Sequence, residues 1–316
     1  MRPDLRLLSL ALLVLAAMGQ AMMVQLPQSA LDANAELIVS GAVTGTESRW
    51  NADNTTIYTY VTLAVDKVDK GTADRAVTVR VPGGEVGDVG MAVEDMPVFQ
   101  IGDRVTLWLV SREGNLELLD GMQSVTQPTD ARPLVYYSYS GYHRDPASCN
   151  YYTYSGLPSG WAGAIQAGGV TWSTAGSAFR FNYLGTTSAS GTVYDGQNVV
   201  SRGSLSNGIL AQNTYWYNRA TKHVVENDIV FNTLYQWSTS GAPGYYDVQN
   251  IGTHEMGHCL VLNDLYKSYH SELTMYGYGA TGETKKQTLE AGDIQGIKVI
   301  YGTGLLRTNL RPTAVD

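Results

Sequence analysis

The sequence predicts an α+β protein: an N-terminal all-β domain followed by a domain of mixed helices and strands. The chain has 316 residues, which is long enough for two domains of ordinary size. In the N-terminal part, short stretches alternate between apolar and polar residues, as half-buried strands do. Further on, Asp247 is a good helix N-cap, and apolar residues at helical spacing follow it at Val248, Ile251, Cys259 and Leu262.

Residues 1–21 have the pattern of a secretory signal peptide. Arg2 and Arg6 supply a positive start, residues 7–17 an apolar core, and Gly19-Gln20-Ala21 a small-x-small cleavage site. The apolar run is short for a membrane-spanning helix. We therefore expect cleavage and secretion, with no stable membrane association afterwards.

The composition limits the classes of partner. The chain has 21 Lys and Arg against 29 Asp and Glu, so its net charge is −8. This acidic balance argues against nucleic acid as a partner and provides no polybasic patch for a membrane surface. Charged residues make up only 16% of the chain, which indicates a weakly charged exterior and a mixed or β-rich structure.

Residues 30–122 are expected to form the N-terminal β-rich domain. Its clearest period-two stretches are residues 57–65, 77–81 and 105–109, and Gly or Pro residues separate them. Short strands with this punctuation predict a small sandwich or barrel. The stretch holds no cluster of metal-ligand residues and no nucleophile beside a base, so prodomain, spacer and binding module all remain open roles.

The remaining boundaries follow from changes in pattern. Residues 123–150 lack periodicity and are rich in Tyr, so they are expected to be a linker that leads into the second domain. Residues 151–303 form the mixed domain, and residues 304–316 form a C-terminal tail. Within the mixed domain we expect a short helix near 161–168 and strands near 179–184, 209–217 and 223–232.

The residues best suited to chemistry form the sequence His254-Glu255-Met256-Gly257-His258, an H-E-x-x-H motif. His254 and His258 are four residues apart, so on a helix they share one face and can bind one metal ion. Glu255 follows the first histidine, where its carboxylate can take a proton from water activated by the metal. This chemistry is typical of zinc.

A third zinc ligand is expected after the helix. Asp264 lies six residues beyond His258 and has the spacing that fits the metal geometry. His270 is the competing residue, because histidine is the commoner zinc ligand and this one lies near enough to reach the site. We favour Asp264. His143 and His223 are expected to be surface or structural residues.

The motif resembles that of the metzincin metalloproteases, and within that clan it is most similar to the matrixins. His254, Glu255, His258 and Asp264 fall on the first, second, fifth and eleventh positions of the pattern H-E-x-x-H-x-x-G-x-x-H/D. Aspartate at the last position is a feature of the snapalysin-like branch. Downstream, residues 274–277 look like the methionine turn and residues 288–297 resemble the final matrixin helix.

The resemblance implies a fold and a ligand set. It implies a twisted mixed sheet with an active-site helix and a C-terminal helix, and one catalytic Zn²⁺ held by His254, His258 and Asp264. Met275 would form an apolar floor beneath the imidazoles. By analogy with a family loop, residues 195–198 could hold calcium. Their spacing matches no dedicated calcium loop, so a turn is the prediction there and calcium stays unassigned.

Two further expectations concern the backbone around the site. The family glycine after the helix is Val261 here, and a β-branched residue is poorly suited to positive φ. We therefore expect the turn to be made elsewhere, at Asn263 for example. The resemblance also matches residues 226–232 to the edge strand above the cleft, where an extended peptide can be held by main-chain hydrogen bonds.

Cys149 and Cys259 are the only cysteines. An even pair in an exported chain usually forms a disulfide, which is the favoured interpretation. The alternative is that Cys149 binds the metal and keeps the enzyme silent, as the propeptide cysteine does in matrixins. The residues around Cys149 do not match that switch motif.

These observations predict a secreted zinc endopeptidase that acts on a protein or peptide substrate. Glu255 would serve as general base and then as general acid. The alternative is an extracellular adhesion or carbohydrate-binding protein with a structural protease-like domain. Against it, every residue that the chemistry needs is present.

Overall fold

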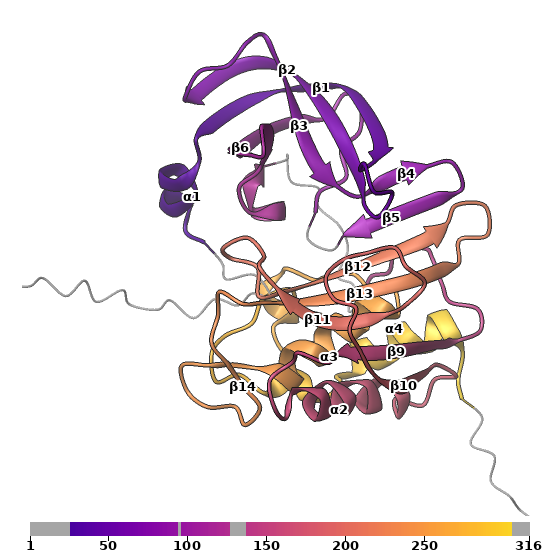
Figure 1. Ribbon diagram of the computed structural model, residues 1–316. Coiled ribbons are helices and arrows are strands. Elements are labelled where there is room, and N and C mark those ends of the chain that lie inside the picture. Colours follow the sequence, from indigo (N-terminus) through magenta and orange to yellow (C-terminus); the bar gives the residue numbers. More distant parts are fainter. Residues whose placement is uncertain (1–25, 94–95, 127–136, 305–316) are drawn as a thin grey trace, which may run out of the picture.

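The computed structural model describes residues 26–93, 96–126 and 137–304. The expected signal peptide and all but the first residue of the expected tail therefore lie outside the described residues. Figure 1 shows two bodies, with the N-terminal strands above and the C-terminal strands and most of the helices below. No helix in the described ranges is long and apolar enough to cross a bilayer.

The upper body is a six-stranded sheet that closes on itself, because its first strand also pairs with its fifth. Alternating inward side chains such as Val61, Leu63 and Leu107 form its core, as the period-two pattern predicts. In spatial order the strands are β1 (Leu37–Trp50), β2 (Ile57–Lys70), β3 (Ala76–Pro82), β7 (Asn115–Leu118), β6 (Arg104–Arg112) and β8 (Val125–Thr126).

Two short helices flank this sheet, α1 (Gln28–Asn34) and η1 (Gly121–Ser124). Leu31 of α1 packs in a small cluster with Ile38 and Trp108 of the sheet. The Trp108 indole Nε1 also donates a hydrogen bond to Asp32 Oδ1 at 2.8 Å. The helix is therefore attached to the sheet by both apolar and polar contacts.

The lower body contains a seven-stranded mixed sheet. β9, β10, β11 and β13 are mutually parallel, and β12 runs antiparallel to β13. In spatial order the strands are β10 (Arg180–Thr187), β9 (Ser148–Tyr154), β11 (Val199–Gly203), β13 (Val224–Asn232), β12 (Ala211–Asn218), β5 (Val89–Val93) and β4 (Gly84–Val86). A separate two-stranded pair joins β14 (Trp237–Ser238) to β15 (Tyr246–Asp247).

The order of this sheet corrects one expectation. Residues 226–232 lie in β13, which is not an edge strand, because it pairs with β11 on one side and with β12 on the other. On the β12 side of the sheet, β12 is the last strand contributed by the C-terminal part, and β10 lies at the opposite edge. The outward edge of β12 is paired with β5, which belongs to a hairpin from the N-terminal part of the chain.

The main helices are α2 (Trp161–Ser173), α3 (Val248–Cys259) and α4 (Ala291–Tyr301), with short 3₁₀ turns η2 (Ser268–His270) and η3 (Lys285–Gln287). α2 and α3 approach closely at Gly168, where a Cβ would lie 2.9 Å from Thr253 Oγ1. The Trp172 indole Nε1 donates to Thr253 O at 2.6 Å. These contacts fix α3, which carries the H-E-x-x-H motif, within the core.

Candidate metal centre

α3 begins where the sequence predicts. The Asp247 carboxylate accepts a hydrogen bond from Asn250 N at 2.8 Å, which satisfies one of the free N–H groups of the first turn. Val248 and Ile251 are fully buried in the main core. The helix is therefore fixed at its start and along its apolar side, which sets the direction of the two motif histidines.

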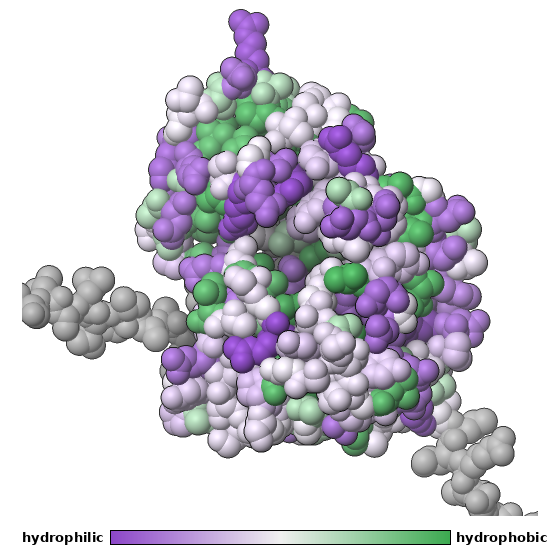
Figure 2. Space-filling view, viewed as in Figure 1, coloured by the Kyte–Doolittle hydropathy of each residue, from purple (hydrophilic) through white to green (hydrophobic). Residues whose placement is uncertain are grey.

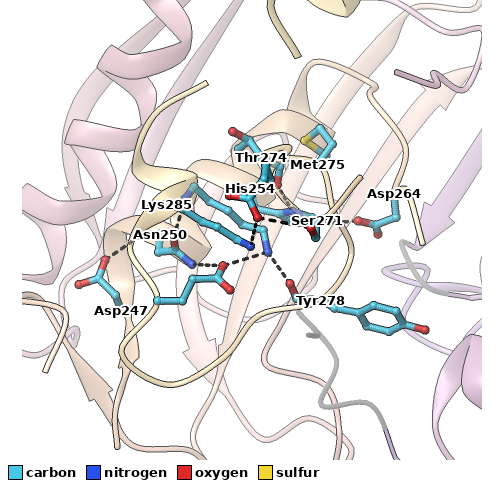
Figure 3. A network of polar contacts seen from close by, with 12 residues as sticks. Asp247, Asn250, His254, Asp264, Ser271, Thr274, Met275, Tyr278 and Lys285 are labelled. Carbon is cyan, nitrogen blue, oxygen red and sulfur yellow. Dashed lines mark hydrogen bonds and ion pairs between the residues drawn. The ribbon is translucent and has the colours of Figure 1, made fainter. Parts of the chain in front are cut away.

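Three side chains converge beside α3. His254 Nε2 lies 3.1 Å from His258 Nε2 and 3.1 Å from Asp264 Oδ1, and His258 Nε2 lies 3.5 Å from Asp264 Oδ2. The ligand atoms of these three residues lie within 4.8 Å of one another. Figure 3 shows Asp264 directed toward His254 from the segment that follows the helix.

Each imidazole is oriented by a backbone carbonyl. His254 Nδ1 lies 2.7 Å from Thr274 O, and His258 Nδ1 lies 2.8 Å from Leu262 O. A carbonyl only accepts, so each Nδ1 carries the proton and each Nε2 presents its lone pair. Burial lowers the pKa of His254 and so favours its neutral form.

This arrangement fits a metal ion. Two imidazole lone pairs and one carboxylate face a common point, which is a set of acceptors that a cation would satisfy. Two nitrogens and an oxygen form the three-residue donor set that is typical of catalytic zinc, in which water takes the fourth position.

Glu255 lies directly after His254 and is 1% exposed. Its backbone carbonyl accepts a hydrogen bond from the Asn213 side-chain amide of β12 at 3.1 Å. The sheet therefore holds this turn of α3 from the side, and the backbone of Glu255 is fixed in place.

The structure places His270 apart from the three converging residues. His270 lies in η2, where its ring packs against Tyr269 with 4.2 Å between ring centroids. Among the described residues, the group whose ligand atoms lie within 4.8 Å of one another consists of His254, His258 and Asp264.

The turn after α3 is made at Val261 itself, so the expectation that it would be made elsewhere is wrong. Val261 has φ +65°. Val261 N donates to His258 O at 2.9 Å and Leu262 N donates to Gly257 O at 3.2 Å, which is the Schellman pattern of helix termination. The Val261 side chain is buried with Tyr215 and Tyr217, and this packing offsets the strained backbone.

Residues from the predicted linker support this turn. Ser140 N donates to Val261 O at 3.0 Å, and Asn263 N donates to Ser138 O at 2.9 Å. The chain therefore leaves α3 along a short backbone pairing, which carries it directly to Asp264. A segment expected to connect two domains instead helps to position the third candidate ligand.

Tyr266 is a residue that the sequence did not single out. Its hydroxyl donates to Asp264 Oδ2 at 3.3 Å. Gly277 approaches the same carboxylate, since a Cβ there would lie 3.0 Å from Asp264 Oδ1. Together they fix the direction of the Asp264 side chain.

The predicted methionine turn lies under the motif helix. Met275 is buried, and a Cβ on Gly257, between the two histidines, would overlap its sulfur. Figure 3 shows Thr274 and Met275 beside His254. The thioether therefore packs against the helix on the turn that links His254 to His258.

Asp293 of α4 holds the methionine turn and was not identified from the sequence. Its carboxylate accepts from Thr274 N at 2.9 Å and from Met275 N at 3.2 Å. It also accepts from Glu290 N at 3.0 Å within a capping box. The signal available in the sequence was the pair Glu290 and Asp293, two acidic residues three positions apart at the start of a helix, as in a capping box. Asp293 thus positions Thr274, whose carbonyl orients His254.

The sequence comparison agrees with this geometry. The matrixin family model matches residues 194–302. This part of the chain is a matrixin-like metzincin. The match spans β11 to α4 and contains both histidines, Glu255, Asp264 and the methionine turn, so it supports a zinc metallopeptidase. A comparison with curated proteins gives no match.

Cys149 and Cys259 are both buried, and both are free thiols in this structure. The predicted disulfide is thus not confirmed. Cys149 packs in the main core with Met256 and Cys259. Within the described residues it is not among the groups that converge on the metal centre, so its position does not favour the switch alternative.

The loop that could hold calcium by analogy is fixed by hydrogen bonds. Asp195 N and Gly196 N donate to the Glu226 carboxylate at 2.9 and 2.6 Å. Val193 N and Val199 N donate to Asp228 at 2.9 and 3.0 Å. Burial raises the pKa of Glu226 to about 7 and that of Asp228 to about 8. These carboxylates accept backbone N–H groups, and no calcium site is assigned.

Proposed function

We propose that the protein is a secreted zinc-dependent endopeptidase that hydrolyses peptide bonds in proteins or peptides. The observation that carries the proposal is the convergence of two imidazole Nε2 atoms and the Asp264 carboxylate. Secretion rests on the sequence pattern of residues 1–21 alone. The adhesion or carbohydrate-binding alternative is supported neither by the family match nor by the site.

Each site residue has a distinct role in the proposed reaction. His254, His258 and Asp264 would hold Zn²⁺, which when bound supplies Lewis-acid activation of water and of the peptide carbonyl. Glu255 accepts the proton of the attacking water and then delivers it to the leaving amine. Tyr266 keeps the Asp264 carboxylate in place.

Glu255→Gln tests the proposal, because it removes the base but no candidate ligand. We expect the rate of cleavage of an unfolded protein substrate to fall by roughly 10²–10⁴-fold, the usual contribution of a general base, while zinc content stays unchanged. The measurement pairs a fluorogenic cleavage assay with metal analysis of the purified protein.

Glu272→Gln is the matched control, since the Glu272 side chain is 75% exposed and bonds Lys285 on the surface. It should cleave at the wild-type rate. Near-normal cleavage by Glu255→Gln would exclude the proposed mechanism.

A further inference from the structure

Figure 2 shows hydrophilic residues spread over the surface of both bodies, which is where charged side chains normally lie. Lys286, in η3, is an exception, because none of its side chain is exposed. Burial lowers the pKa of its ammonium group, since removal from water disfavours a charge, and the Glu283 carboxylate opposes this shift. The proposed reaction does not use this lysine, so its burial needs another explanation.

The Lys286 ammonium joins two parts of the chain. Its Nζ lies 3.2 Å from Glu283 Oε1 and donates to Tyr278 O. Glu283 Oε1 also accepts from the Asn250 side-chain amide at 3.2 Å, and Lys286 N donates to Asn250 Oδ1 at 2.8 Å. Figure 3 shows the chain of contacts from Asn250 to Tyr278. Asn250 lies on α3 one turn before His254, so the ammonium connects the motif helix to the segment that follows the methionine turn.

The segment held in this way, residues 276–278, lies against the third candidate ligand. Gly277 is so close to the Asp264 side chain that an added Cβ would lie 3.0 Å from Oδ1. The Tyr278 ring packs on the Tyr266 ring with 5.2 Å between centroids, and the Tyr266 hydroxyl donates to Asp264 Oδ2 at 3.3 Å. The position of residues 276–278 therefore affects the direction of the Asp264 carboxylate by two routes.

We propose that Lys286 is a positioning residue of the metal centre: it holds residues 276–278 in place and through them orients Asp264 for metal binding. The inference rests on the proposed function, because it concerns the zinc site of that peptidase. A buried ion pair is a weak source of stability, since the cost of desolvating both charges offsets their attraction. The positions that the Lys286–Glu283 pair imposes on its hydrogen-bond partners explain its burial better than stability does.

Lys286→Met/Glu283→Gln tests the inference. Methionine keeps most of the aliphatic stem, and the glutamine carbonyl can still accept from Asn250. Both charges are removed together, so no unpaired charge is left buried and the net charge near the centre is unchanged. We expect the zinc affinity of the purified protein to fall roughly 10–100-fold, the usual effect of losing an outer partner of a metal ligand. Competition with a chromogenic chelator measures it.

Lys285→Met/Glu272→Gln is the matched control. Lys285 is the preceding residue of the same turn, and its Nζ also lies 3.2 Å from a glutamate Oε1, but the Lys285 and Glu272 side chains are 29% and 75% exposed. This variant should bind zinc as tightly as the wild type. An equal loss of zinc affinity in both double variants would refute a specific role for Lys286.

The same change in an Asp264→Ala background separates positioning from a general loss of structure. If Lys286 acts through Asp264, Lys286→Met/Glu283→Gln should have little further effect on zinc affinity there, because no carboxylate is left to orient. A loss by the same factor in both backgrounds would overturn the inference. In the zinc-free proteins, hydrogen exchange should become faster in residues 276–278 and stay unchanged in α3.

Gly277→Ala tests the same link without altering Lys286, so the inference stays testable however the double variant folds. A Cβ at this position would lie 2.5 Å from Tyr266 Cε1 and 3.0 Å from Asp264 Oδ1, so the segment must move away from both. We expect zinc affinity to fall here as well. Gly163→Ala is the control, since its Cβ would meet nothing within 4 Å. Wild-type zinc affinity in Gly277→Ala would show that residues 276–278 do not orient Asp264.

Zinc binding and peptide cleavage distinguish this inference from the proposed function. If the wild type binds zinc and cleaves an unfolded protein while Lys286→Met/Glu283→Gln binds zinc equally tightly, the role of Lys286 is refuted and the peptidase stands. If the zinc affinities change as expected but the wild type cleaves no protein, the peptidase is refuted and the positioning role of Lys286 stands.

Discussion

The two imidazoles are oriented by carbonyls of different origin. Leu262 O, which holds His258, is four residues away, whereas Thr274 O, which holds His254, is twenty residues away. The first of these contacts follows from helix termination, and the second requires the methionine turn and Asp293 to be in place. Binding of the proposed zinc ion would therefore depend on residues that do not contact it.

The choice of third ligand can be tested by metal content. Asp264→Ala removes the carboxylate that approaches both Nε2 atoms, so we expect its zinc occupancy to fall. His270→Ala should retain zinc, because the His270 ring packs on Tyr269 and is not in the converging group. Metal analysis of the two purified variants decides between them, and the reverse ranking would assign the ligand to His270.

Asp293→Asn tests the support of His254. The amide has only one acceptor oxygen where the carboxylate has two, so the hold on Thr274 N and Met275 N is weakened. We expect zinc affinity to fall roughly 10–100-fold, the usual effect of losing an outer-shell partner. Chelator competition measures it, with the exposed Asp53→Asn as control. Unchanged affinity would mean that Thr274 holds its position without Asp293.

The local part of the site was predictable from the sequence. The spacing of His254, Glu255 and His258 is set by the helix period, and Asp264 follows closely enough for its position to be inferred. Tyr266 and Asp293 were not identified, because nothing in the order of residues shows which hydroxyl or carboxylate will meet a given backbone atom in space.

Among the elements, the end of α3 shows a local rule overridden by packing. A valine at φ +65° is unfavourable by about 1–2 kcal/mol. Val261 nevertheless keeps that conformation, since its side chain is buried with Tyr215, Tyr217 and Val224. The sequence-based expectation considered the backbone preference alone, because the strands that supply this packing lie more than thirty residues earlier.

Val261→Gly should therefore cost less stability than the same change elsewhere. Val200 in β11 is buried to a similar degree but has ordinary strand geometry. We expect the loss in free energy of unfolding to be about 1–2 kcal/mol smaller for Val261→Gly than for Val200→Gly, because glycine relieves the left-handed conformation. Denaturant unfolding of both variants measures the difference. Equal losses would show that Val261 is not strained.

The order of the lower sheet illustrates what periodicity cannot show. The stretches 209–217 and 223–232 were both expected to be strands, and both are. Which of them forms an edge of the sheet depends on pairing with strands that are distant in sequence. For this reason β13 was predicted to be an edge strand, whereas it lies between β11 and β12. Alternation identifies a strand and its buried face but not its neighbours.

For the whole molecule, the two bodies share an apolar cluster around Trp216. The predicted domain boundary at residues 123–150 did not anticipate this shared cluster. β4 and β5 lie within the predicted N-terminal domain, residues 30–122, yet they extend the lower sheet. Residues 123–150, expected to be a linker, contain β8, which pairs in the upper sheet, and the start of β9, which pairs in the lower sheet. A pairing between residues more than a hundred positions apart leaves no periodic signal.

Trp216→Ala should uncouple the two bodies. We expect a loss of about 3–5 kcal/mol, as for other large aromatic residues removed from a core, and a thermal transition that splits in two. Trp237→Ala is the control, since Trp237 packs within the C-terminal part only. It should lower the melting temperature without splitting the transition, as calorimetry would show. A single transition in Trp216→Ala would mean that other contacts couple the bodies.

The two carbonyl anchors also set an order in which the centre can form during folding. Once α3 has ended at Val261 and Leu262, the His258 ring is already turned to its final direction by a contact within one helical turn. The carbonyl that orients the His254 ring belongs to Thr274, so this contact requires residues 274–293 to be synthesised and packed against the helix. A chain still emerging from synthesis would thus hold one oriented imidazole for as long as α4 is missing, and its zinc affinity would rise only as the last helix docks.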